Sequence, residues 1–470
     1  MLIWLVLIPL IATALIGLCK APARPTALLS AALTLALGIW ALVSFDGCSS
    51  CWSRFEGMDL QLTLAPALAK VMLLLTILVT FATVLGTNPP KGGEASWYNS
   101  ALLISAGATG AFLSDNIISF FAFHELALIP TFVMIGLYGR TTAWRATLYL
   151  GLASMVLLAA LLMIGTQAGF TFSGLKDFMA GGRELAHAEL IGALLIAGFG
   201  TLISLFPFHS WAAPAYASAP APVAMMHAGV LKKFGLYGLF MFQPLMETGF
   251  LPWTNILLVL LVCNVIWVGY VTVNQKRLDL LLGNSSVMHM GYIFLAFAAL
   301  VASGSAEANP WALKGAALLM LAHGLTIALL FLLCGQIEKQ TGTLEINSLG
   351  GLSTRLPRMA FVFGLAGMAS IGLPGLANFP GEFMVFFSGF AGFNDSFGPV
   401  QIATILCLWG LVIGAVYMLR AYRNIFQGDL SKAAAYATEL LPSERAANYF
   451  LTITLAVFGF FPTLVLQFFS

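Results

Sequence analysis

The stretch IISFFAFHELALIPTFVMIGL, residues 117–137, decides the fold. It is long enough to cross a bilayer, because a membrane-spanning helix takes roughly 20 mostly apolar residues. Glu125 lies about two turns from either end of this run, too deep for its short side chain to reach water. A charge at the bilayer centre costs roughly 2.5–3.5 kcal/mol on insertion scales, so such a residue is a candidate for proton transfer. The alternative is a protonated glutamate held by one hydrogen bond.

Similar apolar runs recur along the whole chain of 470 residues. Hydrophobic residues make up 60% of the sequence, charged residues 9%, and the mean hydropathy is +0.94. A soluble domain of this size needs far more charge to cover its surface. We therefore expect an all-α integral membrane protein, a single polytopic domain with about fourteen transmembrane helices. The net charge of +2 and the absence of a basic tail give no reason to expect a nucleic-acid partner.

Hydropathy places the fourteen expected helices along the chain with short connections between them. The first run, Leu2 to Cys19, lacks the basic start and cleavage site of a secretion signal, so we expect a retained helix. The longest polar connection spans residues 167–189. The expected helices are 2–19, 25–45, 63–86, 99–114, 117–138, 142–166, 190–207, 219–246, 251–274, 280–302, 311–337, 358–391 (one long broken segment), 400–424 and 446–468.

The distribution of Lys and Arg predicts the orientation of the chain. Of the 21 basic residues, fourteen fall in connections on one side, while Arg54, Lys176, Arg183 and Lys314 fall on the other. The remaining lysines, at positions 70, 232 and 233, lie within helices. Because positive residues accumulate on the cytoplasmic side, both termini should lie outside.

Two expected spans carry prolines that should break them, the seventh at Phe206-Pro207-Phe208 and the twelfth at Leu373-Pro374-Gly375. Proline removes a backbone donor and clashes with the preceding turn. Paired broken helices in two halves of a transporter indicate inverted repeats with sites near the midplane. We expect N-terminal helices in residues 1–98, repeats at 99–246 and 251–424, and a C-terminal helix at 446–468.

The eighth span contains His227, Lys232 and Lys233. Adjacent helical residues point about 100° apart, so the two lysines cannot face the same partner. One of them is then free to snorkel or to line a second file of water. A lysine buried in apolar surroundings exchanges protons more readily near neutral pH.

Further ionisable residues follow in the later spans. Glu382 comes just after the second break, and His289 and His323 lie in the tenth and eleventh spans. His209 stands beside the first break. A lone membrane histidine serves as often for packing as for proton transfer. Together, however, carboxylates, lysines and histidines have the composition of a lateral proton path.

Signals for a cofactor or a metal site are missing from the sequence. No Walker loop, strand-borne GxGxxG or CxxCH motif occurs, so we expect no nucleotide, haem or cluster in this chain. Cys48 and Cys51 form a CxxC in a loop without further ligands nearby. A local disulfide or two free thiols are the remaining readings, and a non-cytoplasmic loop would preserve a disulfide.

An ordered set of motifs resembles subunit M of proton-pumping NADH–quinone oxidoreductase (respiratory complex I), in the wider antiporter-like family. The resemblance covers most of the chain. Its motifs are His124-Glu125-Leu126 with Ile129-Pro130, Phe206-Pro207-Phe208-His209-Ser210-Trp211, Ala228-Gly229-Val230-Leu231-Lys232-Lys233, Ser285-Ser286-Val287-Met288-His289-Met290-Gly291, Ala322-His323-Gly324-Leu325, Leu332-Leu333-Cys334-Gly335-Gln336 and the segment 372–383.

The resemblance implies an antiporter-like fold and a set of roles. Glu125 corresponds to the fifth-helix glutamate and Lys233 to the eighth-helix lysine, which would pass a proton sideways. His289, His323 and Glu382 fall on the family's polar axis, with Glu382 exchanging the proton towards the outside. The expected partners are other membrane subunits, antiporter-like neighbours and a peripheral arm with flavin and iron–sulfur clusters. The expected location is the bacterial inner membrane.

The sequence departs from the family pattern at several positions. Leu202 stands where the family has a seventh-helix lysine, the usual partner of Glu125. Our hypothesis is that the extra lysine, Lys232, takes over this pairing. The order of charges at Gln275-Lys276-Arg277-Leu278-Asp279, the long connection at 303–310 and the lack of an acidic residue in 211–214 also differ from the family.

Three functions remain open on the sequence. The leading interpretation is a proton-translocating subunit of an NADH–quinone oxidoreductase. The alternative is a membrane subunit of a related hydrogenase or of a multisubunit sodium–proton antiporter, which share the fold and most buried charges. A structural spacer with an interrupted path is the third, although Glu125, Lys233 and Glu382 would be costly residues to retain without use.

Overall fold

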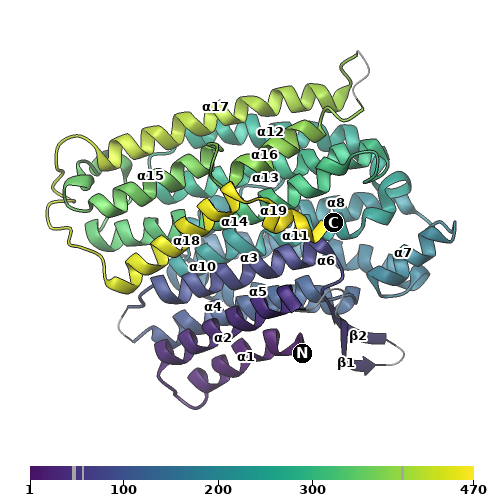
Figure 1. Ribbon diagram of the computed structural model, residues 1–470, viewed down its shortest axis with the longest axis horizontal. Coiled ribbons are helices and arrows are strands. Elements are labelled where there is room, and N and C mark those ends of the chain that lie inside the picture. The colour runs from purple at the N-terminus through teal and green to yellow at the C-terminus, as the bar shows by residue number, and fades with distance from the viewer. Residues whose placement is uncertain (45–48, 56–57, 91, 393–395, 470) are drawn as a thin grey trace.

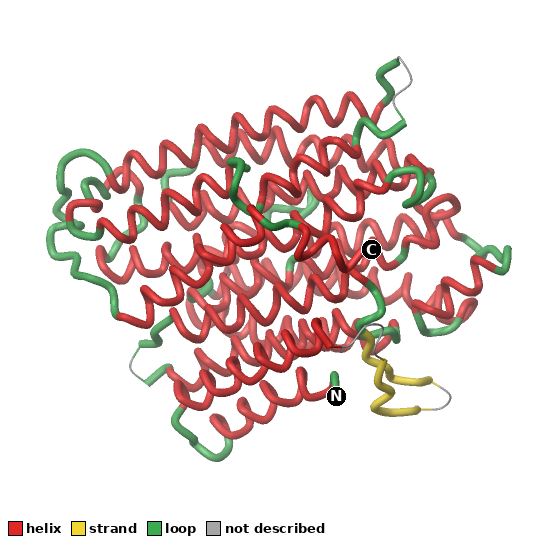
Figure 2. The backbone as a smooth tube through the Cα atoms, viewed as in Figure 1, coloured by secondary structure: helices red, strands yellow, loops and turns green. Residues whose placement is uncertain are grey.

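The computed structural model describes residues 1–44, 49–55, 58–90, 92–392 and 396–469. Helices dominate it, and most run roughly parallel or antiparallel across the longest dimension of the molecule (Figure 1). Loops gather mainly at the two ends of these helices (Figure 2). The helices are α1 (Ile3–Gly17), α2 (Ala23–Ser44), α3 (Ala67–Gly86), α4 (Glu94–Leu113), α5 (Ile117–Tyr138), α6 (Arg140–Ala168), α7 (Phe172–Ala180), α8 (Ala188–Ile203), α9 (Ala212–Ser218), α10 (Ala221–Met226), α11 (Lys233–Met241), α12 (Thr254–Val273), α13 (Leu278–Ser303), α14 (Pro310–Thr341), α15 (Pro357–Ile371), α16 (Asn378–Ser388), α17 (Pro399–Phe426), α18 (Pro442–Phe460) and α19 (Thr463–Leu466).

Helical segments lie at each of the fourteen predicted spans. Within the described residues, eight helices are long and apolar enough to cross a membrane by themselves, or nine if the bent pair of 442–460 and 463–469 is one span. Other predicted spans contain shorter or interrupted helices, such as α8 and the pair α15 and α16. The all-α, multi-pass membrane architecture predicted from the sequence is therefore confirmed.

Both predicted breaks are present. At the first break, α8 ends at Ile203, the next residue Ser204 adopts a left-handed backbone with φ +72°, and α9 begins at Ala212. At the second break, α15 ends at Ile371, the next residue Gly372 has φ +82°, and α16 begins at Asn378. A left-handed residue after a helix ends the regular hydrogen bonding. The two unwound segments are thus the places where backbone groups become available to side chains.

Two further elements lie at one end of the molecule and were not predicted as elements. Strands β1 (Ser49–Phe55) and β2 (Met58–Thr63) pair as an antiparallel hairpin. The short helix α7 lies in the polar connection 167–189 and is capped by Thr171, whose hydroxyl accepts from Gly174 N. Figure 1 shows both elements at the same end, towards which both chain termini also lie.

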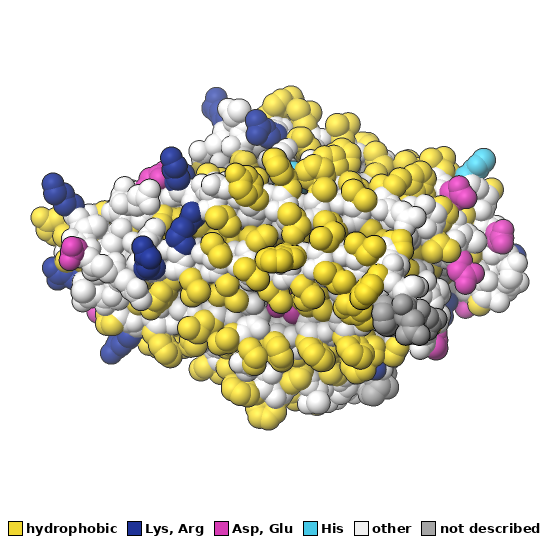
Figure 3. Space-filling model, turned by 90° about the horizontal axis from the view of Figure 1, so that it is seen from above, with side chains coloured by type: hydrophobic (Ala, Val, Ile, Leu, Met, Phe, Trp, Pro, Cys, Tyr) yellow, Lys and Arg dark blue, Asp and Glu magenta, His cyan; other side chains and the backbone are white. Residues whose placement is uncertain are grey.

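Two central helices form the core of the bundle. Almost every side chain of α13 and of the apolar middle of α14 is buried, whereas α2, α6, α12 and α17 carry large apolar side chains on their outer faces. Figure 3 shows that hydrophobic side chains cover the middle of one face, while most of the visible Lys and Arg side chains lie towards the left end. A band of apolar surface between charged ends is the surface expected of a membrane protein. His289 and His323 lie on the two most enclosed helices.

Candidate functional site

Lys233 and His323 form the centre of the buried polar site. The ammonium Nζ of Lys233, at the start of α11, lies 2.9 Å from Nδ1 of His323 on α14 and donates to the Ala228 carbonyl at 2.6 Å. Both side chains are buried. A buried cation requires such partners, because it has lost its hydration. Lys233 is therefore in direct contact with His323, one of the residues that the resemblance placed on the polar axis.

Two glycines allow this close contact between α14 and the π-helical turn His227–Leu231 that precedes the lysines. A Cβ atom at Gly324 would lie 2.7 Å from the Gly229 carbonyl oxygen, and one at Gly229 would lie 3.1 Å from the Gly324 carbonyl oxygen. Any larger residue would push the two backbones apart. Gly229 and Gly324, which belong to the motifs around Lys233 and His323, thus let the two backbones approach closely enough for the lysine to reach the histidine.

The neighbouring lysine points in another direction. Lys232 donates a long hydrogen bond of 3.4 Å to Ser286 Oγ on α13, and its Nζ lies 5.6 Å from the centre of the Tyr216 ring on α9. Lys233 faces α14 instead. The prediction that the two lysines cannot share a partner is confirmed.

His289 connects the core to the second break. One ring nitrogen, Nδ1, lies 2.8 Å from the Ser285 carbonyl, and the other, Nε2, lies 2.9 Å from the Ser370 carbonyl near the end of α15. Its ring centre is 5.6 Å from that of His323. A neutral imidazole has only one N–H donor, whereas an imidazolium has two. The two carbonyl oxygens therefore fit the protonated ring, so this position can hold a proton.

Glu382 lies at the other side of the same break. Its carboxylate, on α16, is buried and packs directly against Gly372, where a Cβ atom would collide with Oε2. The other oxygen, Oε1, has no hydrogen-bond partner among the described residues. Tyr292, whose ring is 5.5 Å from that of His289, also has a buried hydroxyl without a partner in the described part of the chain. Buried polar groups of this kind are commonly completed by water.

Glu125 lies at the opposite margin of the polar site. Ser154 on α6 donates to Oε1 at 2.7 Å, and Nδ1 of the adjacent His124 lies 3.4 Å from the same oxygen. The Glu125 side chain is 36% exposed, while His124 is buried and stacked 3.7 Å from the ring of Phe234. The carboxylate therefore reaches the outer surface of this chain between α5 and α6, although the run around it is apolar.

The direct pairing of Lys232 with Glu125 proposed from the sequence is not formed. Among the described residues, the partners of Glu125 are Ser154 and His124, and the partners of Lys232 are Ser286 and the Tyr216 ring. The reason is directional, because the lysine follows a π-helical turn that aims it at α13, while the glutamate faces α6. Leu202 is buried on α8, so this position supplies no charge between them.

The first break is stabilised by a residue that the sequence analysis did not identify. Asn264 on α12 accepts a hydrogen bond of 2.5 Å from Phe206 N and donates at 3.2 Å to the carbonyls of Ser204 and Val287. A lone asparagine inside an apolar run was the signal available in the sequence.

His209 and His227, two further histidines that the sequence analysis considered for proton transfer, lie in different places. His209 lies in the first break, half-buried and stacked on Phe206, whereas His227 lies buried between Trp211 and Tyr216.

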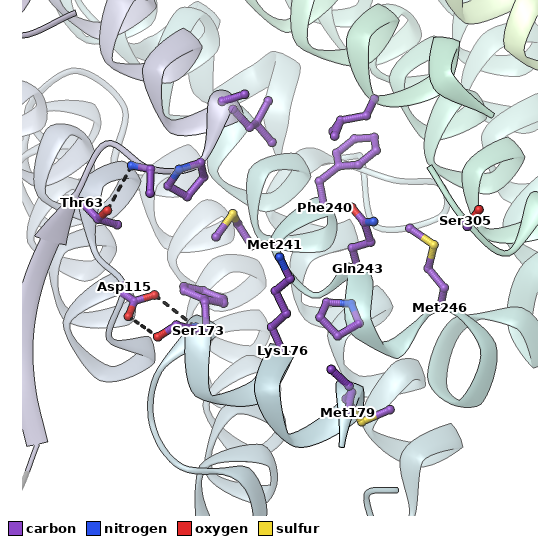
Figure 4. Close-up of a pocket in the computed structure, with 18 of the residues that line it drawn as sticks. Thr63, Asp115, Ser173, Lys176, Met179, Phe240, Met241, Gln243, Met246 and Ser305 are labelled. Carbon is purple, nitrogen blue, oxygen red and sulfur yellow. Dashed lines mark hydrogen bonds between the residues drawn. The ribbon is translucent and has the colours of Figure 1, made fainter. Parts of the chain in front are cut away.

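A cavity of about 930 Å³ opens at the hairpin end of the molecule, away from these residues (Figure 4). Lys176 of α7 points into it, and Ser173 donates to a carboxylate oxygen of Asp115 at 2.7 Å. None of the candidate residues lines this cavity. The buried polar axis is therefore a feature of the packed core.

Charged residues near the opposite end form ion pairs. Arg277 donates to Asp279 at 2.6 Å, and Lys339 donates to Glu444 at 2.9 Å. The Asp279 carboxylate raises the pKa of Arg277. The sequence analysis left open whether Cys48 and Cys51 form a disulfide, and their side chains lie outside the part of the chain whose side chains the structure describes. Among the described residues, no group of three His, Cys, Asp or Glu side chains is placed to hold a metal ion.

The comparisons with known proteins agree with this architecture. Residues 114–419 match the family described as NADH:quinone oxidoreductase/Mrp antiporter, TM. NAD(P)H-quinone oxidoreductase chain 4 2 of Microcystis aeruginosa is 32% identical over 386 residues, covering 79% of this chain and 67% of the relative.

Two solved structures share the fold. A chain of respiratory complex I from Thermus thermophilus with bound NADH matches with a TM-score of 0.88 and 26% identity, covering 100% of this chain and 97% of that one. A chain of the membrane-bound sulfane sulfur reductase, an archaeal respiratory membrane complex, matches with a TM-score of 0.86 and 23% identity, covering 97% of this chain and 75% of that one. The second likeness concerns the fold alone.

Proposed function

Because the chain belongs to the family of NADH:quinone oxidoreductase and Mrp antiporter membrane subunits, we propose that it is a proton-translocating membrane subunit of an NADH–quinone oxidoreductase. The observation that carries this proposal is the sequence of close contacts from Lys233 through His323 and His289 to the break beside Glu382. Charges inside a membrane protein are costly, and here they line one continuous region of the core.

The geometry suggests how a proton moves along the axis. Lys233 donates towards Nδ1 of His323, and a proton transferred there leaves a neutral amine and an imidazolium. His323 then passes a proton from its other nitrogen towards His289, whose two carbonyl neighbours fit the charged ring. The two ring centres lie 5.6 Å apart and no hydrogen bond joins the two imidazoles among the described residues, so a bridging water would carry the second step. Glu382 accepts the proton beyond the break and releases it.

The driving force lies elsewhere in the proposed complex. This chain would carry no redox centre, and flavin and iron–sulfur clusters would sit in partner subunits. Its partners would be other membrane subunits, including antiporter-like neighbours, and a peripheral redox arm. The half-exposed carboxylate of Glu125 lies on an outer face, where a charge change in a neighbouring subunit would reach it directly. We place the protein in the bacterial inner membrane with both termini outside, as the bias of basic residues indicates.

The alternative function is that of a membrane subunit in a related machine, a hydrogenase-like complex or a multisubunit sodium–proton antiporter. Its support is the family description, which includes Mrp antiporters, and the fold shared with the sulfane sulfur reductase chain. Both alternatives would use the same buried residues. They differ in the electron donor and in the subunits that accompany this chain.

Purification through a tag on this chain, in mild detergent, separates the alternatives. The preparation is assayed for quinone reduction driven by NADH and by hydrogen, and its subunits are identified. NADH-dependent activity with co-purifying flavin and iron–sulfur subunits would support the proposal. Hydrogen-dependent activity, or a complex with no redox subunit, would contradict it and favour the related machines.

A further inference from the structure

We propose that Tyr216 is a proton-relay residue that joins Lys232 to His227 in the first half of the proton path. The inference rests on the proposed function, because it concerns how protons cross the first half of the same axis. Tyr216 lies on α9, immediately after the first break, and is not among the residues that the sequence motifs indicated.

A connection is needed at this place because the first half of the axis is interrupted. Among the described residues, the Glu125 carboxylate has polar contacts only with Ser154 and His124, and the His124 ring is stacked on the apolar ring of Phe234. Lys232 contacts neither of them among the described interactions. A proton moving between Glu125 on α5 and the lysines at the start of α11 therefore needs a further polar group between them.

Tyr216 has the geometry of such a group. Its ring centre lies 5.6 Å from Nζ of Lys232 and 5.3 Å from the ring of His227, which meets it edge to face. The side chain is 1% exposed, and its hydroxyl has no hydrogen-bond partner among the described residues. A buried hydroxyl that is left unsatisfied costs free energy, so few are retained without a partner.

His227 presents the complementary group. Its imidazole is buried against Trp211 and Tyr216, and its Nδ1 also lacks a partner in the described part of the chain. Two unsatisfied polar atoms, on adjacent rings beside a buried ammonium, form a site in which one water molecule can bond several partners. Nδ1 of His124, which lies 3.4 Å from Glu125 Oε1, is likewise buried and makes no hydrogen bond of regular geometry among the described residues.

The relay conserves charge at every step. The Lys232 ammonium gives a proton through a bridging water to the hydroxyl oxygen of Tyr216, while the hydroxyl hydrogen leaves towards His227. The O–H bond that breaks is replaced by the one that forms, so tyrosine stays neutral. Lys232 ends as a neutral amine and His227 as an imidazolium, and transfer in the opposite direction restores both. No oxidant or other reactant takes part.

The opposing interpretation is that Tyr216 only fills space. Its ring packs against Trp211 and Phe331, and a phenylalanine would preserve these contacts. Replacing Tyr216 by Phe therefore removes the hydroxyl and little else, which makes the substitution a direct test. Tyr98 supplies a matched control, because it is equally buried but its hydroxyl donates to the Thr87 carbonyl at 3.3 Å, away from the axis.

The test uses the purified complex in liposomes, with protons translocated per NADH oxidised as the readout. Tyr216→Phe should slow proton transfer by about tenfold, the kinetic equivalent of losing the one hydrogen bond that the hydroxyl would make to the relaying water, and should lower the ratio. Tyr98→Phe should leave the ratio unchanged. Tyr216→His should restore pumping, since an imidazole both accepts and donates a proton. A Tyr216→Phe complex that pumps like the wild type would overturn the inference.

Two further variants keep the outcomes separate. If Lys233→Met pumps like the wild type, the proposed function fails, whatever the result at Tyr216. If Lys233→Met abolishes pumping and Tyr216→Phe does not affect it, only the relay is wrong. Should Tyr216→Phe fail to assemble, Tyr216→His decides: an assembled, pumping complex supports the relay, and an assembled complex that does not pump contradicts it.

Discussion

Substitutions at His323 separate proton transfer from structural support. The residue forms the 2.9 Å contact with the Lys233 ammonium, and both side chains are buried. His323→Leu removes the acceptor and leaves the cation with fewer partners. His323→Gln supplies an amide oxygen that can accept from Lys233, but an amide cannot take up the proton.

The magnitude follows from the lost interaction. A hydrogen bond to a charged group contributes about 1.5–3 kcal/mol, which corresponds to roughly a 10- to 150-fold slower step if the loss falls on proton transfer. We expect His323→Leu to slow proton pumping by this factor, because the contact is lost, and His323→Gln to slow it as well, because the amide keeps the contact but cannot take up the proton. Because the amide preserves the contact, only His323→Leu should also lower the free energy of unfolding by about the same 1.5–3 kcal/mol.

The assay combines protons translocated per NADH in liposomes with the thermal unfolding midpoint of the purified complex. His187, an exposed histidine before α8, provides the control substitution His187→Gln. A His323→Gln complex with wild-type pumping would refute the relay role and leave His323 as a structural partner of Lys233. Loss of thermal stability without loss of pumping in His323→Leu would lead to the same conclusion.

Two further predictions concern the broken helices. Gly372→Ala should lower the unfolding free energy by about 1–2 kcal/mol and reduce pumping, since alanine is strained at φ +82° and its Cβ would displace the Glu382 carboxylate. Thermal unfolding and pumping assays measure both effects. The control is Gly151→Ala, at a helical glycine with open space around it, which should show neither effect. Asn264→Leu should cost about 1–3 kcal/mol for each backbone group left without a partner, beginning with Phe206 N, and a thermal midpoint equal to that of the wild type would show that the first break does not depend on this amide.

Much of the fold was predictable because hydropathy and proline act locally. The apolar run around Glu125 predicted its span, and Pro207 and Pro374 predicted the positions of the two breaks. The different directions of Lys232 and Lys233 followed from helical geometry alone. The hairpin β1–β2 and the helix α7 were missed because they lie in connections where hydropathy gives no signal.

The partners of the buried residues were less predictable, because they depend on packing between distant segments. Lys232 was expected to pair with Glu125, yet its neighbours are Ser286 and Tyr216, 54 and 16 positions away in the chain. The π-helical turn before the lysines sets this direction, and no pattern in the sequence indicated it. The exposure of Glu125 likewise depends on which face α5 turns outward. Asn264, a lone polar residue in an apolar run, was a signal of such a partner that the sequence did contain.

The most direct test of the proposed function is the number of protons translocated per NADH by the purified complex, compared between the wild type and Lys233→Met. Methionine has nearly the length of lysine but carries no proton, so packing should change little. Proton transfer through the buried axis predicts that the substitution abolishes this chain's share of pumping while the complex stays assembled. An assembled Lys233→Met complex with the wild-type ratio would contradict it, and would show that this chain supports the complex without moving protons.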